Sequence, residues 1–186
     1  MKRIFEPTQG SLLVSEPFLA DSFFKRSVVL LSEHDKKGTL GFILNKPTDV
    51  TVNQAVDNFP EFEAPLYFGG PVETDTLFYI HTLGETLKGA IEITKGIWFG
   101  GDFETLKNMI EEKKVTSNQI RFYAGYSGWE PDQLENEMRE KAWLVTDAPS
   151  DFTYFGEPEV LWGKVLKSMG NEYAILSTFP EDPSLN

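Results

Sequence analysis

Two apolar segments joined by a polar turn constrain the fold of this chain more than any other feature. Residues 27–32 (SVVLLS) and 39–45 (TLGFILN) are rich in Val, Ile and Leu, which predicts two strands. Between them, residues 34–38 are polar and end in Gly38, and Pro47 stops the second segment. The pattern predicts an antiparallel hairpin. The unbroken apolar run of residues 27–32 further predicts a strand that is covered on both faces.

The remaining segments predict further strands and helices, which together indicate an α+β domain. Further strands are predicted at residues 10–15, 66–68, 77–81, 90–93, 96–99, 119–126 and 143–145. Helices are predicted at 51–59 with Thr51 as cap, at 103–113 with Asp102 as cap and at 132–138 after Pro131. A last helix is predicted to include residues 160–166 and to end at Gly170. Strands outnumber helices without regular alternation, so we expect one α+β domain over residues 1–186 with a mainly antiparallel sheet and several packed helices. Residues 180–186, with two prolines and no periodicity, are expected to fray.

Charge and composition exclude several classes of protein. Across 186 residues, 17 Lys and Arg stand against 29 Asp and Glu, a net charge of −12 that argues against direct nucleic-acid binding. No apolar stretch approaches the roughly 20 residues of a membrane span, and Glu6 and Pro7 interrupt the N-terminus before a signal sequence could form. The absence of Cys excludes disulfides, iron–sulfur clusters and thiol catalysis. We therefore expect an acidic cytoplasmic protein.

Motifs that would carry catalysis are incomplete. Ser127 lies in a sequence close to the nucleophile elbow of serine hydrolases, but Trp129 replaces the second glycine, and a tight glycine-rich turn is the simpler interpretation. Gly100 and Gly101 precede a predicted helix, yet Asp102 already places a carboxylate there, which favours capping over phosphate binding. The two histidines, His34 and His81, lack the spacing of a metal motif. No catalytic residue, metal site or cofactor is therefore assigned.

Several sequence blocks, in this order and spacing, are similar to those of one bacterial family. They are GSLLV at 10–14, RSVVLL at 26–31, GFILNKP at 41–47, YFGGPV at 67–72, HTL at 81–83, GGDFE at 100–104 and RFYAGYSGW at 121–129. Together they resemble the AlgH/YqgE family over nearly the whole chain. One departure is Asp132, where the family often has Gly before a Gln-Leu pair.

The resemblance implies a fold and leaves the activity open. It implies a compact α+β domain with a central barrel-like sheet and no established reaction. Some members are labelled transcriptional regulators, although the family has no recognised DNA-binding motif. Because this chain is acidic, a regulatory role is expected to operate through a protein or small-molecule partner.

The residues that carry the resemblance concentrate in turns and at strand ends, where binding groups often collect. The leading hypothesis is therefore a non-catalytic binding or regulatory module, with Arg26 pairing an anionic group and Tyr126 or Trp129 stacking on the ligand. The candidate pocket comprises Arg26, His34, Asn45, Gly69, Gly70, His81, Tyr126 and Trp129. A structural alternative is that Arg26 and Asn45 only fix the turns around them. The alternative function is an enzyme of unrecognised type, such as a hydrolase, that uses His34 or His81 as general base or metal ligand.

Overall fold

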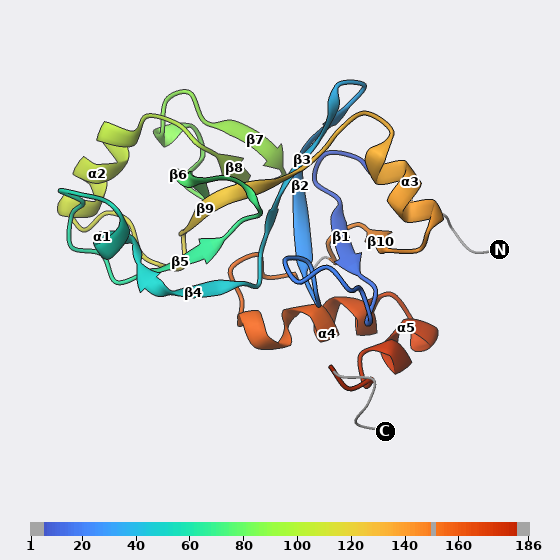
Figure 1. Ribbon diagram of the computed structural model, residues 1–186. Coiled ribbons are helices and arrows are strands. Elements are labelled where there is room, and N and C mark those ends of the chain that lie inside the picture. The colour runs from blue at the N-terminus through green and yellow to red at the C-terminus, as the bar shows by residue number, and fades with distance from the viewer. Residues whose placement is uncertain (1–5, 150–151, 182–186) are drawn as a thin grey trace.

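The predicted hairpin forms the centre of one half of the sheet. In the computed structural model, which describes residues 6–149 and 152–181, β2 (Val28–Asp35) pairs with β3 (Gly38–Ile43) as predicted. β1 (Leu12–Ser15) pairs with the other edge of β2, and β10 (Trp143–Thr146) pairs with β1 (Figure 1). The prediction that the first hairpin strand is covered on both faces is confirmed, because Leu30 enters one core and Val29 another.

One long strand joins this half to the rest of the molecule. β9 (Ile120–Trp129) pairs with β3 through its last residues, and its first residues lie between antiparallel β6 (Val72–His81) and parallel β5 (Pro65–Phe68). β8 (Ile97–Phe99) and β7 (Ile91–Thr94) extend the sheet beyond β6, and β4 (Pro47–Thr51) pairs with β5. The side chains of β9 alternate between two cores, with Phe122 in one and Tyr123 in the other.

Five helices and a short 3-10 turn, η1 (Gly84–Thr86), complete the described part of the chain. α4 (Pro158–Ser168) covers one face of β1–β3 with α5 (Asn171–Leu176) packed beside it, and α3 (Gln133–Arg139) covers the other face (Figure 1). α1 (Val52–Ala55) and α2 (Phe103–Glu111) cover the half that contains β5 and β6. The expected α+β class with a large antiparallel sheet is confirmed.

The expectation of a barrel-like sheet needs correction, because the sheet is not closed. The strand order runs β10-β1-β2-β3-β9-β6-β8-β7, which leaves β10 and β7 as edges in the described residues. The side-chain amide of Gln9 donates hydrogen bonds to the carbonyl oxygens of Glu92 and Ile93, at 3.1 and 3.0 Å. A side chain therefore satisfies carbonyl groups of β7, where barrel closure would require a strand.

The predicted boundaries fail where side chains redirect the backbone. The helix expected at 51–59 ends after one turn, because the Asn53 amide donates to the Phe59 and Pro60 carbonyls and Asn58 adopts a left-handed φ of 55°. The Thr51 cap is confirmed and forms a capping box with Gln54. β4, which begins at Pro47, and α5 were not predicted. The predicted frayed end lies mostly outside the described residues, which stop at residue 181.

Candidate functional site

The eight predicted pocket residues lie in three separate parts of the structure. Tyr126 and Trp129 lie in the last part of β9, and His34 lies beside them on the hairpin. Arg26 and Asn45 lie at the opposite end of β2, and the stretch of β2 between Val28 and His34 extends about 20 Å. Gly69 and Gly70 pack directly against the β9 backbone at Gly125 and Tyr126, whereas His81 lies apart at the end of β6. The structure does not gather all eight around one cavity.

Tyr126 and Trp129 line a groove that forms the candidate site. This hairpin groove, of about 470 Å³, lies between the β2–β3 hairpin and the end of β9. Its charged lining consists of the carboxylates of Glu33, Asp35 and Glu130 and the ammonium of Lys37. The remaining lining residues are Gly38, Thr39, Leu40, Val72, Tyr126, Gly128, Trp129 and Gln133. The groove therefore combines an excess of negative charge with an aromatic surface.

Gly128 lies close beside the Tyr126 ring. It is exposed, and a Cβ atom built on it would lie 3.3 Å from Tyr126 Cε2 and 3.7 Å from a Val72 methyl group, both of which line the groove. The Tyr126 ring packs edge-on against Phe78, with ring centroids 5.6 Å apart. Packing from below thus fixes the ring while the missing Gly128 side chain leaves part of the groove unfilled.

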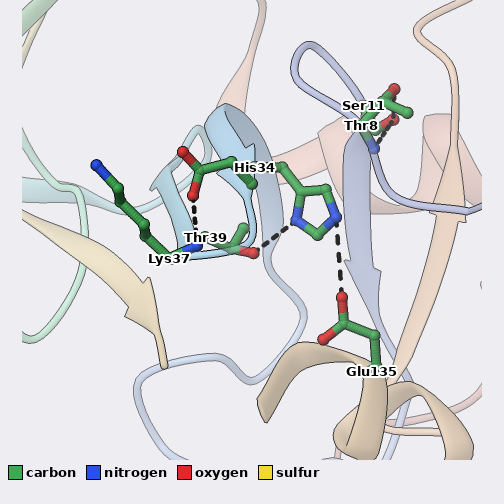
Figure 2. A network of polar contacts seen from close by, with 7 residues as sticks. Thr8, Ser11, His34, Lys37, Thr39 and Glu135 are labelled. Atoms are coloured by element: carbon green, nitrogen blue, oxygen red, sulfur yellow. Dashed lines mark hydrogen bonds and ion pairs between the residues drawn. The ribbon is translucent and has the colours of Figure 1, made fainter. Parts of the chain in front are cut away.

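His34 lies behind the groove, on the other face of the hairpin. Successive side chains of a strand point to opposite faces, so Glu33 and Asp35 face the groove while His34 faces α3. Its Nδ1 lies 2.7 Å from the Thr39 hydroxyl oxygen, and its Nε2 lies 3.8 Å from Glu135 Oε1. Figure 2 shows the imidazole ring held between these two side chains. His34 therefore does not line the groove, and it meets the groove lining through Thr39.

A single carboxylate fastens α3 behind the groove. Glu137 Oε2 accepts hydrogen bonds from the indole N–H groups of Trp129, at 3.0 Å, and Trp143, at 2.8 Å. Glu137 Oε1 accepts a third bond from the Gln133 amide, at 2.9 Å. α3 enters through Asp132, which has a left-handed φ of 65°. The residue that replaces the family's usual Gly therefore keeps a conformation that glycine adopts without strain.

Arg26 and Asn45 meet at the far end of β2. The Asn45 side-chain amide donates to the Arg26 carbonyl oxygen, at 2.9 Å, and Asn45 Oδ1 accepts from the Val28 amide, at 2.9 Å. Arg26 itself has a left-handed φ of 49°. Asn45 therefore holds the turn that leads into β2, and the Arg26 guanidinium lies over the Trp162 ring, 4.8 Å from its centroid.

Gly69 and Gly70 form part of the junction between β5, β6 and β9. A Cβ atom at Gly69 would lie 2.2 Å from the Gly125 carbonyl oxygen, and one at Gly70 would lie 2.2 Å from the Tyr126 carbonyl group. Gly125 has a left-handed φ of 69° at the point where β9 passes between its partners. Ser127 is buried within β9 and donates to the Gly69 carbonyl oxygen, at 2.9 Å. These glycines permit close contact between backbones.

His81 is fully buried at the end of β6. Its Nε2 lies 2.8 Å from the Gly100 carbonyl oxygen, and its Nδ1 accepts from the Leu83 amide, at 3.2 Å. Burial lowers the pKa of His81, while the hydrogen bond to Gly100 acts in the opposite direction. This neutral ring therefore has a main-chain partner at each nitrogen.

The sequence blocks that build the groove and the glycine junction match a known family model. The AlgH-like family model (DUF179) matches residues 12–174. The chain belongs to the AlgH-like family. A UPF0301 protein of Cytophaga hutchinsonii is 44% identical over 180 residues, covering 96% of this chain and 99% of that one. A UPF0301 protein of Bacteroides thetaiotaomicron is 43% identical over 181 residues, covering 97% and 92%.

Two solved structures share the AlgH-like fold. The crystal structure of a protein from Corynebacterium diphtheriae superposes with a TM-score of 0.76 at 26% identity, covering 96% of this chain and 95% of that one. The solution structure of the AlgH protein from Pseudomonas aeruginosa gives a TM-score of 0.73 at 26% identity, covering 97% and 98%. The likeness in fold extends over nearly the whole chain.

Sequence reasoning missed several residues that the AlgH-like fold brings to these places. Alternation along the hairpin strand puts Glu33 and Asp35 on one face, which was the signal for the acidic side of the groove. Lys46, next to Asn45 in its sequence block, donates to the Lys25 carbonyl oxygen, at 2.6 Å. No group of three or more His, Asp or Glu side chains in the described residues could hold a metal ion. In the same residues, no helix is long and apolar enough to cross a membrane.

Proposed function

We propose that this AlgH-like chain is a non-catalytic binding or regulatory module of the cytoplasm that acts through a cationic partner bound in the hairpin groove. The observation that carries the proposal is the acidic lining of a groove of about 470 Å³ beside the Tyr126 ring. The partner chemistry is a protonated amine or guanidinium, carried by a basic protein segment or by a small polyamine.

The charge distribution supports a cationic ligand. Glu33, Asp35 and Glu130 are exposed, and they outnumber the single Lys37 in the lining. The Asp35 carboxylate also accepts a hydrogen bond from the Lys37 main-chain amide, at 2.7 Å, which orients it at the hairpin tip. Because the whole chain carries a charge of −12, its field attracts cations toward this groove.

The aromatic side of the groove supports a specific contact beyond charge. The face of a tyrosine ring attracts a cation that lies within about 6 Å of its centre. Tyr126 is partly exposed in the groove, and Gly128 leaves space beside it. Trp129 is 5% exposed and contributes to the packed base of the groove, where Glu137 holds its indole. Of the predicted pocket residues, we retain Tyr126 and Trp129 in this site, with His34 supporting it from behind.

Titration of the full chain with two fluorescent probes tests the proposal. One probe is a labelled nonapeptide of alternating Lys and Gly, and the other is a labelled spermidine. We expect the double variant Glu33→Gln/Asp35→Asn to weaken binding about five-fold or more, because two of the facing charges are removed. Gly128→Ala should weaken binding while the fold persists, because the added methyl group fills part of the groove and the Tyr126 ring can shift by a few tenths of an ångström.

A matched control separates the groove from the overall charge. Glu61→Gln/Glu63→Gln removes two exposed carboxylates with the same spacing, in the segment before β5 and away from the groove. Equal weakening in the control and the groove variant would show that binding depends on the overall negative charge and not on the groove. Failure of both probes to bind wild-type protein would refute the proposal. Preference for the peptide over the polyamine would identify a protein partner.

A further inference from the structure

Residues 177–181, here called the C-terminal segment, lie against a basic corner formed by Lys25, Arg26 and Lys46. The Phe179 carbonyl oxygen accepts a hydrogen bond from the Arg26 guanidinium, and the Phe179 ring stacks on Phe18 with centroids 5.6 Å apart. Burial lowers the pKa of Lys46, whereas the nearby Glu181 carboxylate acts to raise it. The segment thus presents an aromatic ring, a carbonyl group and a carboxylate to this corner within three residues.

The basic corner is fixed by the core beneath it. The Arg26 guanidinium lies over Trp162, whose indole N–H donates to the Ser15 carbonyl oxygen at 3.0 Å. Asn45 holds the Arg26 main chain, and the Lys46 ammonium is held by the Lys25 carbonyl oxygen. These contacts orient the cations independently of the C-terminal segment. A preformed arrangement of this kind lowers the ordering cost of binding a peptide.

One donor in this corner has no partner. Arg26 Nε is buried without a hydrogen bond among the described residues. A buried donor without a partner costs free energy, so an acceptor group that reached it would be favoured. The Phe179 carbonyl engages Nη2, which leaves Nε to an additional acceptor group on a displacing partner. The C-terminal segment therefore leaves this corner incompletely satisfied.

The C-terminal segment itself is lightly held. α5 contains no fully buried residue, and Ile175 is 61% exposed. Beyond α5, the Thr178 and Phe179 amides donate to carbonyl groups of α5. Within the described part of the chain, the hydrogen bond from Arg26 is the one that joins residues 177–181 to the body of the domain. Elements with few buried contacts open at low free energy.

We propose that Phe18, Lys25, Arg26 and Lys46 form a second binding site, specific for an extended peptide segment in which a carboxylate follows an aromatic residue by two positions. The chain's own Phe179-Pro180-Glu181 fills this site in the absence of a partner. The partner is a protein that carries such an acidic segment and displaces the C-terminal residues. The site lies at the opposite end of β2 from the acidic hairpin groove, so the two sites select partners of opposite charge.

A peptide copy of residues 175–181, ILSTFPE, labelled at its N-terminus, tests this site on the full chain. Phe179→Ala removes the ring that stacks on Phe18 and loosens the internal segment. We expect this variant to bind the peptide about ten-fold more tightly than wild type, by fluorescence anisotropy at low salt. In the Phe179→Ala background, Arg26→Gln and Lys46→Gln should each weaken binding about ten-fold. Lys95→Gln, an exposed lysine outside the site, is the matched control.

Three results would overturn the inference. They are the absence of peptide binding to Phe179→Ala, equal binding by this variant and wild type, and binding that Lys46→Gln and Lys95→Gln reduce equally. If Arg26→Gln disturbs the turn, Lys46→Gln still tests the site, because its Gln amide can still donate to the Lys25 carbonyl group. Changing the peptide's Phe to Ala, or its Glu to Gln, should reduce binding. Unchanged affinity for both altered peptides is a fourth result that would overturn the inference.

Discussion

His81 and His34 each lie near the end of a strand, in corners of opposite character. In the closed corner, His81 is fully buried and both ring nitrogens contact main-chain groups of Leu83 and Gly100. In the open corner, the side chain of His34 is 19% exposed and both ring nitrogens face other side chains. Main-chain partners cannot move away without disturbing the sheet, whereas side chains can rotate. The closed corner therefore maintains the fold, and the open corner adjoins the groove that we propose as a binding surface.

The largest expected effect is the loss of His81. His81→Ala removes a buried ring and leaves the Gly100 carbonyl and the Leu83 amide without their partners. We expect the free energy of unfolding to fall by about 2–4 kcal/mol. Urea denaturation followed by circular dichroism measures this change. A loss below about 1 kcal/mol would show that the closed corner is not structural.

The next effect is a loss of stability in acid. Because burial lowers the pKa of His81 in the folded state, the unfolded chain binds the proton more readily. The stability that the neutral ring contributes is present above its ordinary pKa of about 6.5 and decreases as the pH falls below that value. His81→Gln should reduce this pH dependence between about pH 7 and 5, and His34→Gln is the matched control for loss of one histidine. An unchanged slope in His81→Gln would contradict the prediction.

A smaller effect is expected from Tyr79, also in the closed corner. Its hydroxyl donates to the Gly101 carbonyl oxygen at 2.5 Å, and burial, with the neighbouring Asp102, raises its pKa to about 12. The contribution of the protonated hydroxyl is therefore present below the ordinary pKa of about 10 and is lost as the pH rises through about 12. Tyr79→Phe should cost about 1 kcal/mol at neutral pH. It should also reduce the alkaline loss of stability, and an unchanged alkaline slope would refute this assignment.

Local pattern predicted much of the fold, and long-range contacts explain the rest. The hairpin, the alternation of β9 and the Asp102 cap follow from spacing between near neighbours, and the structure confirms all three. The contact at the open edge of the sheet depends instead on Gln9, whose side chain bonds the Glu92 and Ile93 carbonyl groups more than 80 positions away. No local pattern encodes that contact. Similarly, the Asn53 side chain bonds the main chain of Phe59 and Phe62 and so shortens α1, whereas the helical spacing alone predicts a helix as far as residue 59.

The sequence identified individual residues of the candidate site, but it did not show which of them lie together. The family-like blocks identified Tyr126 and Trp129, which line the groove, and Arg26 and Asn45, which meet each other at a different end of β2. Sequence could not show that these pairs are separated, because the turn conformations at Arg26 and Gly125 decide where each block points. It also could not show that Glu137 joins Trp129 to Trp143, since the bonds arise only when α3 packs on the sheet.

The smallest effect is expected in the open corner. His34→Ala removes one hydrogen bond to Thr39 and a 3.8 Å contact with the half-exposed Glu135, so we expect a loss of about 0.5 kcal/mol. Affinity for the cationic probes should change less than about two-fold, because a rim contact of this kind contributes little and His34 faces α3 instead of the groove. Denaturation and probe titration of the same variant check both statements. A loss equal to that of His81→Ala would abolish the distinction between the corners. A large loss of affinity at unchanged stability would instead place His34 in the binding surface and assign it a role that its orientation does not support.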